Sequence, residues 1–99
     1  MLIQHPLEAD VSVIPSEFSL ILPNNLPQVA GVVLACCSHG DSLQVVAAHA
    51  TSNIRAHVEE NAISWASNCA GYLRYLVFLS DDEKARIEML SRVKKCIAS

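Results

Sequence analysis

Apolar residues recur every three or four positions through the middle of the chain, from Asp41 to Leu79. Side chains with this spacing share one face of an α-helix. No proline or glycine interrupts the segment between Asp41 and Ala70, and Asp41 with Gln44 has the spacing of a capping box. The pattern therefore predicts one long helix over residues 42–79. Its stripe consists of Leu43, Val46, Ala50, Ile54, Val58, Ala62, Trp65, Cys69, Leu73 and Leu76.

Two shorter helices are predicted on either side of the long one. Residues 26–38 are apolar on nearly all sides, which is typical of a buried helix, and Gly40 can end it in a left-handed conformation. Ser80 and Glu83 form a second capping box, which predicts a helix over residues 81–97. The apolar stripe of this last helix consists of Ile87, Leu90, Val93 and Ile97, widened by Met89 and Cys96.

The first 25 residues form an extended N-terminal arm. Prolines at positions 6, 15 and 23, followed by Pro27, leave no room for a long helix. Apolar residues alternate with others at Val11 and Val13 and again over residues 18–22. The arm is either a short β ribbon or a tethered coil.

The expected fold is mainly α: an arm over residues 1–25 and a helical domain over residues 26–99. Its helices span about 26–38, 42–79 and 81–97. A helix over 42–79 would be on the order of 58 Å long, whereas a compact monomer of this size is about 35 Å across. The projecting half would be apolar, so we expect a homodimer to complete the helical bundle. A break near Asn53 or Asn61 would instead give a compact monomer.

Composition narrows the class of protein. Hydrophobic residues make up 52% of the chain, which favours a single folded domain, and the net charge of −3 argues against nucleic-acid binding. The N-terminus has no signal-peptide pattern, and no apolar run reaches the roughly 20 residues of a membrane span. The four cysteines have no regular spacing. We therefore expect reduced thiols and a cytoplasmic location.

Polar residues at steps of four border the long stripe: His49, Asn53, His57 and Asn61. The two histidines would be roughly 12 Å apart along one helix, too far to bind one metal ion. The border is either a solvated edge of the helix or a polar, pH-dependent part of an interface. The predicted partner or dimer interface is Leu43, Val46, His49, Ala50, Asn53, Ile54, His57, Val58 and Asn61.

A second hypothesis is a small-molecule-binding or enzymatic bundle in which Cys36, Cys37 and His39 lie near Trp65. Adjacent cysteines on one helix point about 100° apart and do not fit a zinc site, so buried structural thiols are the simpler interpretation. Trp65 is expected to be an anchor of the core. No phosphate-binding loop or serine elbow is present. We therefore predict no enzyme activity, no cofactor and no metal.

The favoured function is that of a small cytoplasmic regulatory protein that binds another protein through an amphipathic helix, sequestering or inhibiting it. Its expected partners are a second copy of the chain and an unidentified protein, with no nucleic acid. No membrane is expected unless Cys96 is prenylated. The ending Cys96-Ile97-Ala98-Ser99 after two lysines matches a prenylation box, although the same residues complete the last helical stripe.

Overall fold

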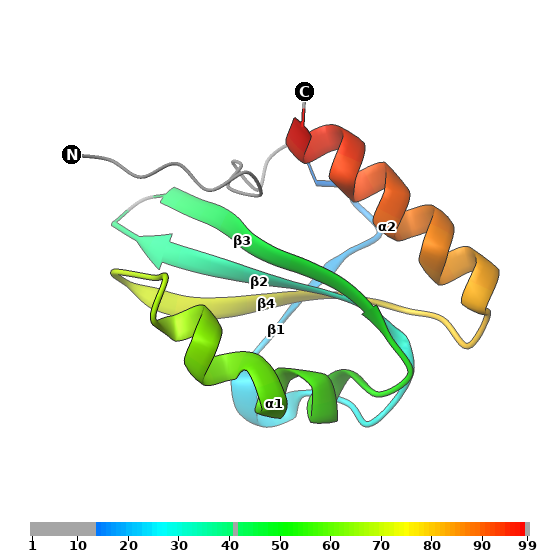
Figure 1. Cartoon of the computed structure of the whole chain (residues 1–99), viewed down its shortest axis with the longest axis horizontal. Coiled ribbons are helices and arrows are strands. Elements are labelled where there is room, and N and C mark those ends of the chain that lie inside the picture. The colour runs from blue at the N-terminus through cyan, green and yellow to red at the C-terminus, as the bar shows by residue number, and fades with distance from the viewer. Residues whose placement is uncertain (1–13, 41, 99) are drawn as a thin grey trace.

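The fold is a four-stranded antiparallel sheet with one α-helix on each face (Figure 1). The computed structural model describes residues 14–40 and 42–98. The elements are β1 (Ser19–Ile21), a 3-10 helix (Pro23–Asn25), β2 (Gly31–His39), β3 (Ser42–Thr51), α1 (Ile54–Ala66), β4 (Tyr72–Leu79) and α2 (Glu83–Ala98). The strands lie in the order β1-β4-β2-β3, and each neighbouring pair is antiparallel. The prediction of a mainly α three-helix bundle is wrong, because this sheet forms the centre of the molecule.

The first predicted helix, over residues 26–38, is wrong because its main part is the central strand β2. β2 pairs with β4 on one side and β3 on the other, and helices cover both faces, so its first six residues are all buried. A strand buried on both faces has an unbroken apolar run, which periodicity alone does not distinguish from a buried helix. The β-branched residues Val32 and Val33 favour the strand. Successive side chains pack under α1 (Val33, Ala35) and under α2 (Val32, Leu34, Cys36).

The long helix predicted over residues 42–79 is also wrong, because this segment folds into β3, α1 and β4. In β3 a bulge leaves Val46 without a paired residue, since Ala35 pairs with Ala47 and Cys36 with Val45. The extra residue inserts a step of three into an alternating strand pattern, which then resembles the spacing of a helix. The homodimer predicted through a projecting helix therefore has no such helix to form it.

The chain leaves the sheet at Asn53, one of the two predicted break points. Asn53 is the N-cap of α1, and its Oδ1 accepts a hydrogen bond from the Ala56 N–H at 3.1 Å. Asn61, the other predicted break point, lies inside α1 and its Nδ2 donates to the His57 carbonyl at 2.8 Å. After α1, Gly71 lets the backbone pass close to β2, because a Cβ there would overlap the Ser38 carbonyl oxygen.

An α-helix, α2, lies where the sequence places the last one. Asp82 caps it, since its Oδ1 accepts a hydrogen bond from the Lys84 N–H at 3.1 Å. Ser80, the predicted cap, instead accepts from the Asp82 N–H at 3.2 Å. Met89, Val93 and Ile97 bury the helix against the sheet.

Within the described part of the N-terminal arm, β1 joins the sheet. β1 pairs with β4, and the Phe18 ring lies 6.1 Å from that of Phe78. The Asp41 capping position, the strand expected at Val11 and Val13, and Ser99 lie outside the described residues.

Candidate functional site

β3 forms one edge of the sheet, and no described strand pairs with its outer side. It is ten residues long, whereas β1 at the other edge has three. Proteins usually protect a long edge with charged residues, proline or a bulge. β3 has no Asp, Glu, Lys, Arg or Pro, and its one protective feature is the bulge at Val46. The regular segment Ala47–Thr51 therefore presents backbone N–H and C=O groups to which another strand can bind.

One flank of α2 lies beside this edge. Four residues of α2 are spaced by four, three and four positions and so lie along the same side of the helix: Glu83, Ile87, Leu90 and Lys94. A hollow of about 240 Å³ separates the end of β3 from the start of α2 and includes Glu83 and Ile87. A second hollow, of about 400 Å³, continues along α2 and includes Ile87, Leu90 and Lys94. Ile87 is 56% exposed although it is a large apolar residue.

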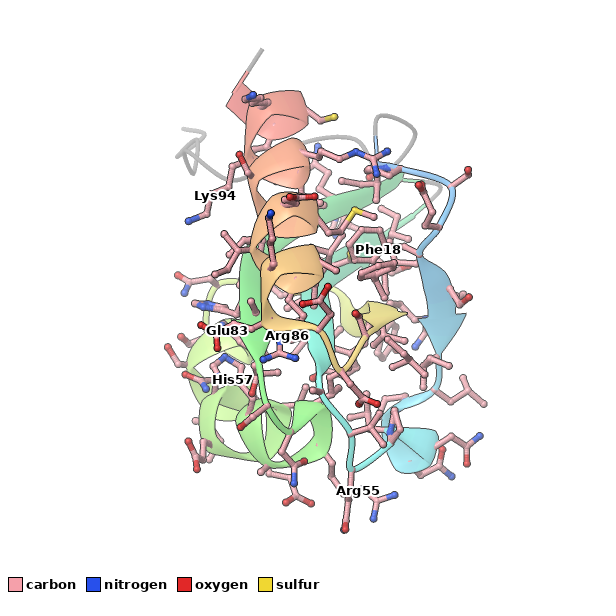
Figure 2. All side chains as sticks on the ribbon, turned by 90° about the vertical axis from the view of Figure 1, so that its right-hand side faces the viewer. Phe18, Arg55, His57, Glu83, Arg86 and Lys94 are labelled. Atoms are coloured by element: carbon pink, nitrogen blue, oxygen red, sulfur yellow. A yellow bond between two sulfur atoms is a disulfide. The ribbon has the colours of Figure 1, made fainter. Side chains whose placement is uncertain are left out.

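The opposite flank of α2 is covered. Phe18 packs there, and Figure 2 shows it across α2 from Glu83 and Lys94. The Arg92 guanidinium binds the Glu17 carboxylate at 3.1 Å, and this hydrogen bond lowers the pKa of Glu17. Of the two flanks of α2, only the one beside β3 is therefore open within the described chain. We call the segment 47–51 together with this flank of four residues the β3–α2 surface.

An aromatic cluster between α1 and the sheet supports β3 from its other face. The His49 ring lies 4.9 Å from His57 and stacks on Trp65 at 5.9 Å, and Trp65 lies 6.3 Å from Tyr75. The expected 12 Å between the histidines is wrong because they lie on a strand and a helix that pack together. Trp65 is 7% exposed, which confirms it as a core residue.

The surroundings of His49 favour its neutral form. Partial burial of the ring lowers the pKa of His49, and the nearby His57 and Lys94 lower it further. The Nε2 atom of His57 is buried with no hydrogen-bond partner in the described chain. Two imidazoles alone are a weak metal site, and residues 14–40 and 42–98 contain no group of three potential metal ligands.

The predicted interface residues do not share one face. Leu43 and Ala50 pack toward α2, whereas Val46 packs toward α1. Ile54 and Val58 belong to α1 and are buried between this helix and the sheet. The remaining members lie at the α1 side of β3 or in and before α1: His49, Asn53, His57 and Asn61.

The residues of the alternative pocket are also separated. Cys36 is buried on the α2 side of the sheet, and burial raises its thiol pKa to about 12, which disfavours a reactive thiolate. Trp65 belongs to α1 and is buried on the opposite side of the sheet. His39 is exposed at the end of β2, where its carbonyl oxygen accepts a hydrogen bond from the Ser42 hydroxyl at 2.9 Å.

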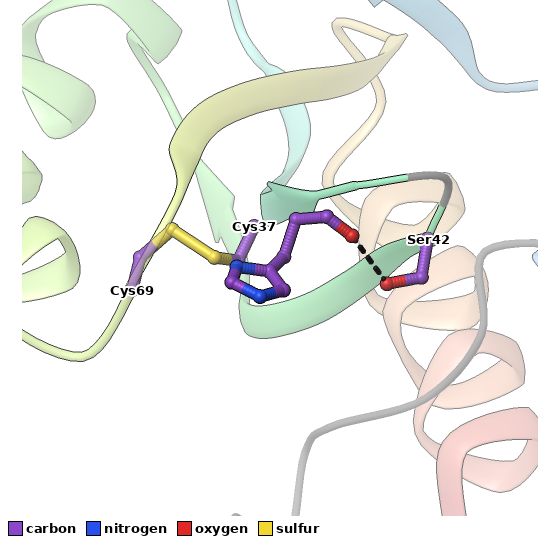
Figure 3. Close-up of a disulfide and its surroundings, with 4 residues drawn as sticks. Cys37, Ser42 and Cys69 are labelled. Atoms are coloured by element: carbon purple, nitrogen blue, oxygen red, sulfur yellow. Dashed lines mark hydrogen bonds between the residues drawn. A yellow bond between two sulfur atoms is a disulfide. The ribbon is translucent and has the colours of Figure 1, made fainter.

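Cys37 is joined to Cys69 by a disulfide (Figure 3). Their Cα atoms are 5.5 Å apart, and the bond joins the end of β2 to the loop between α1 and β4. The expectation of four reduced cysteines is therefore wrong for this pair. Their separation of 32 residues gives no sequence signal, because pairing depends on the sheet register that brings Cys37 next to Leu73.

The C-terminal prenylation box is largely helical. Cys96 lies within α2, and Ile97 is 7% exposed in the core, so an enzyme would have to unwind the last turn to reach the box. No helix in the described chain is long and apolar enough to cross a membrane.

Comparisons with protein-family models, with curated proteins and with solved structures found no match. The sequence analysis did not identify the flank of α2 beside β3 as a candidate binding surface. The sequence contains a pattern for it, because Ile87 and Leu90 lie at helical spacing between Glu83 and Lys94. That pattern can be interpreted only when it is known which side of α2 the sheet covers.

Proposed function

We propose that this chain is a regulatory protein-interaction module that binds a strand of another polypeptide along the edge of β3. The observation that carries the proposal is a ten-residue edge strand without charge or proline, open within the described chain and bordered by an apolar flank of α2. A role in sequestering or inhibiting the bound protein stays a prediction.

Strand addition supplies both affinity and selectivity. The backbone groups of the added strand pair with those of β3, and its alternate side chains enter sites on the two faces of the sheet. On one face they would lie beside Ile87 and Leu90 of α2. On the other they would lie beside His49, which is supported by Trp65. An extended segment with apolar residues at alternate positions fits the α2 side.

The test compares two matched substitutions of exposed isoleucines on helices. Ile87→Asp places a charge on the β3–α2 surface, and Ile63→Asp places one on α1, where Ile63 is 87% exposed. Proteins captured from a native extract by the wild type and by Ile63→Asp should be lost with Ile87→Asp. In the captured complex, the amides of residues 47–51 should exchange hydrogen more slowly than in the free chain. Capture that is unaffected by Ile87→Asp, or exchange that is unchanged in β3, would contradict the proposal.

The absence of enzyme activity and the cytoplasmic location stay predictions. The reactivity of Cys36 tests the first, and the redox state of Cys37 and Cys69 tests the second. A catalytic thiol should react rapidly in the folded protein, whereas burial predicts that Cys36 reacts only after unfolding. Cytosolic thiols are kept reduced, so thiol trapping in intact cells should modify Cys37 and Cys69 if the chain resides there. Protection of both would place it in an oxidising compartment.

A further inference from the structure

We infer that a second copy of this chain occupies the β3–α2 surface, with the two β3 strands antiparallel about a two-fold axis near His49. The inference rests on the proposed function and names its partner. It differs from the helical dimer expected from the sequence, because the contact runs along a sheet edge.

The flank of α2 is complementary to itself in reverse. Its steps of four, three and four residues are the same in both directions. When two copies of α2 lie antiparallel, Glu83 therefore comes opposite Lys94 of the second copy, and Ile87 opposite its Leu90. A two-fold axis repeats both contacts, which gives two ion pairs and two apolar contacts.

The position of α2 over β3 determines where the two-fold axis crosses β3. The two elements run in opposite directions (Figure 1), and residues 50–52 lie beside Glu83 and Ile87. The midpoint of the flank, between Glu88 and Met89, is about 5 Å further along α2 at 1.5 Å per residue. β3 covers that distance in about one and a half residues at 3.3 Å per residue. The axis therefore passes close to His49.

This register avoids the bulge. With His49 opposite its own copy, Ala48 pairs with Ala50 and Ala47 with Thr51 of the second chain, so Val46 lies outside the paired segment. Small side chains at Ala48 and Ala50 let the two copies of α2 approach each other above the strands. The new pairing is antiparallel, as is every pairing within the sheet, and gives one sheet of eight strands.

Charge favours a second copy over an unrelated strand. Each chain carries a net charge of −3, so two copies repel each other unless their charges are arranged in opposition. β3 itself contributes no acidic or basic residue other than His49. The ends of α2 contribute opposite charges that meet in the antiparallel arrangement. A contact of five strand residues and four helix residues is small, so the dimer should dissociate on dilution.

The experiment uses charge exchange between two variants. Light scattering of the wild type should give twice 10.7 kDa at high micromolar concentration and approach 10.7 kDa on dilution. Glu83→Lys and Lys94→Glu should each weaken association about tenfold, because two equivalent surface ion pairs become repulsive. An equimolar mixture of the two variants should recover the dimer mass, because each heterodimer restores both opposite-charge contacts. Glu88→Lys, on the outer side of the same helix, is the matched control and should associate as the wild type does.

The mixture separates association from stability. Glu83 also stabilises the first turn of α2, so a fold defect in Glu83→Lys would not be repaired by adding Lys94→Glu. A mass of 10.7 kDa at all concentrations, or dimers that the mixture does not recover, would overturn the inference. In either case the capture experiment with Ile87→Asp still decides whether β3 binds a different polypeptide.

Discussion

The two edges of the sheet are built in contrasting ways. β1 has three residues, lies between Pro15 and Pro23, and is preceded by Glu17 in an ion pair with Arg92. β3 has ten residues and no such features apart from its bulge. Short length, proline and charge are the usual means of preventing a sheet edge from pairing with another chain. This contrast is the reason for proposing association along β3 and not along β1.

The largest expected effect comes from the support beneath β3. Trp65→Ala should lower the free energy of unfolding by about 3–5 kcal/mol, because it removes a large buried side chain that packs on His49 and Tyr75. Phe18→Ala, near the β1 edge, should cost less because Phe18 is only half-buried. Urea unfolding of both variants measures the difference. Equal losses would show that the two edges are supported alike.

The disulfide should contribute next. Cys69→Ser should lower the free energy of unfolding by about 3.7 kcal/mol, the amount expected from closing a loop of this length. The same loss should follow from adding a reductant to the wild type, whereas the variant should not respond to the reductant. An unfolding midpoint of the wild type that does not move on reduction would contradict this prediction.

A pair of surface substitutions compares the edges directly. Leu20 in β1 and Ile87 beside β3 are 57% and 56% exposed, so Leu20→Asp and Ile87→Asp place the same charge at equally exposed sites. Each should change stability by roughly 0.5 kcal/mol or less. Only Ile87→Asp should abolish the doubled mass in light scattering. Loss of association with Leu20→Asp would assign the interface to β1 instead.

The smallest expected effect is a pH dependence at His49. Burial, then His57 on α1 and Lys94 on α2, lower the pKa of His49 below 6.5 in the folded chain. The unfolded chain therefore binds the proton more readily, so this contribution to stability is complete above pH 6.5 and is lost as the pH falls through the folded pKa. Urea unfolding across this range should show the loss in the wild type and a smaller one in His49→Gln. The same pH dependence of stability in the wild type and in His49→Gln would contradict this prediction.

The last helix, α2, was the most predictable element of the chain. The acidic start at residues 81–83 and the stripe ending at Ile97 indicate a helix by local signals, and α2 lies there. Local capping and periodicity act within a few residues, so they are visible in one sequence. The open flank of α2 was not predictable, because it depends on which side residues 14–18 and the sheet cover.

The centre of the chain was mispredicted for a physical reason. Val32 and Val33 in β2 lie in an unbroken apolar run, and the bulge at Val46 disturbs the alternation in β3. Both patterns satisfy a helical period, and only pairing with distant strands selects the extended form. The break at Asn53 was nevertheless visible, since asparagine is a favoured N-cap. The Cys37–Cys69 bond follows from the same long-range pairing.

The most direct test of the account is an intermolecular contact measured by isotope-filtered NMR. A mixture of labelled and unlabelled chains at a concentration where the mass is doubled should show a contact between the methyl groups of Ala48 and Ala50 of different copies. Directly opposed residues in antiparallel strands have Cβ atoms about 4.5–5.5 Å apart, so this contact should be strong. Intermolecular contacts that arise from β1, or that are missing from Ala48 and Ala50, would contradict strand pairing along β3.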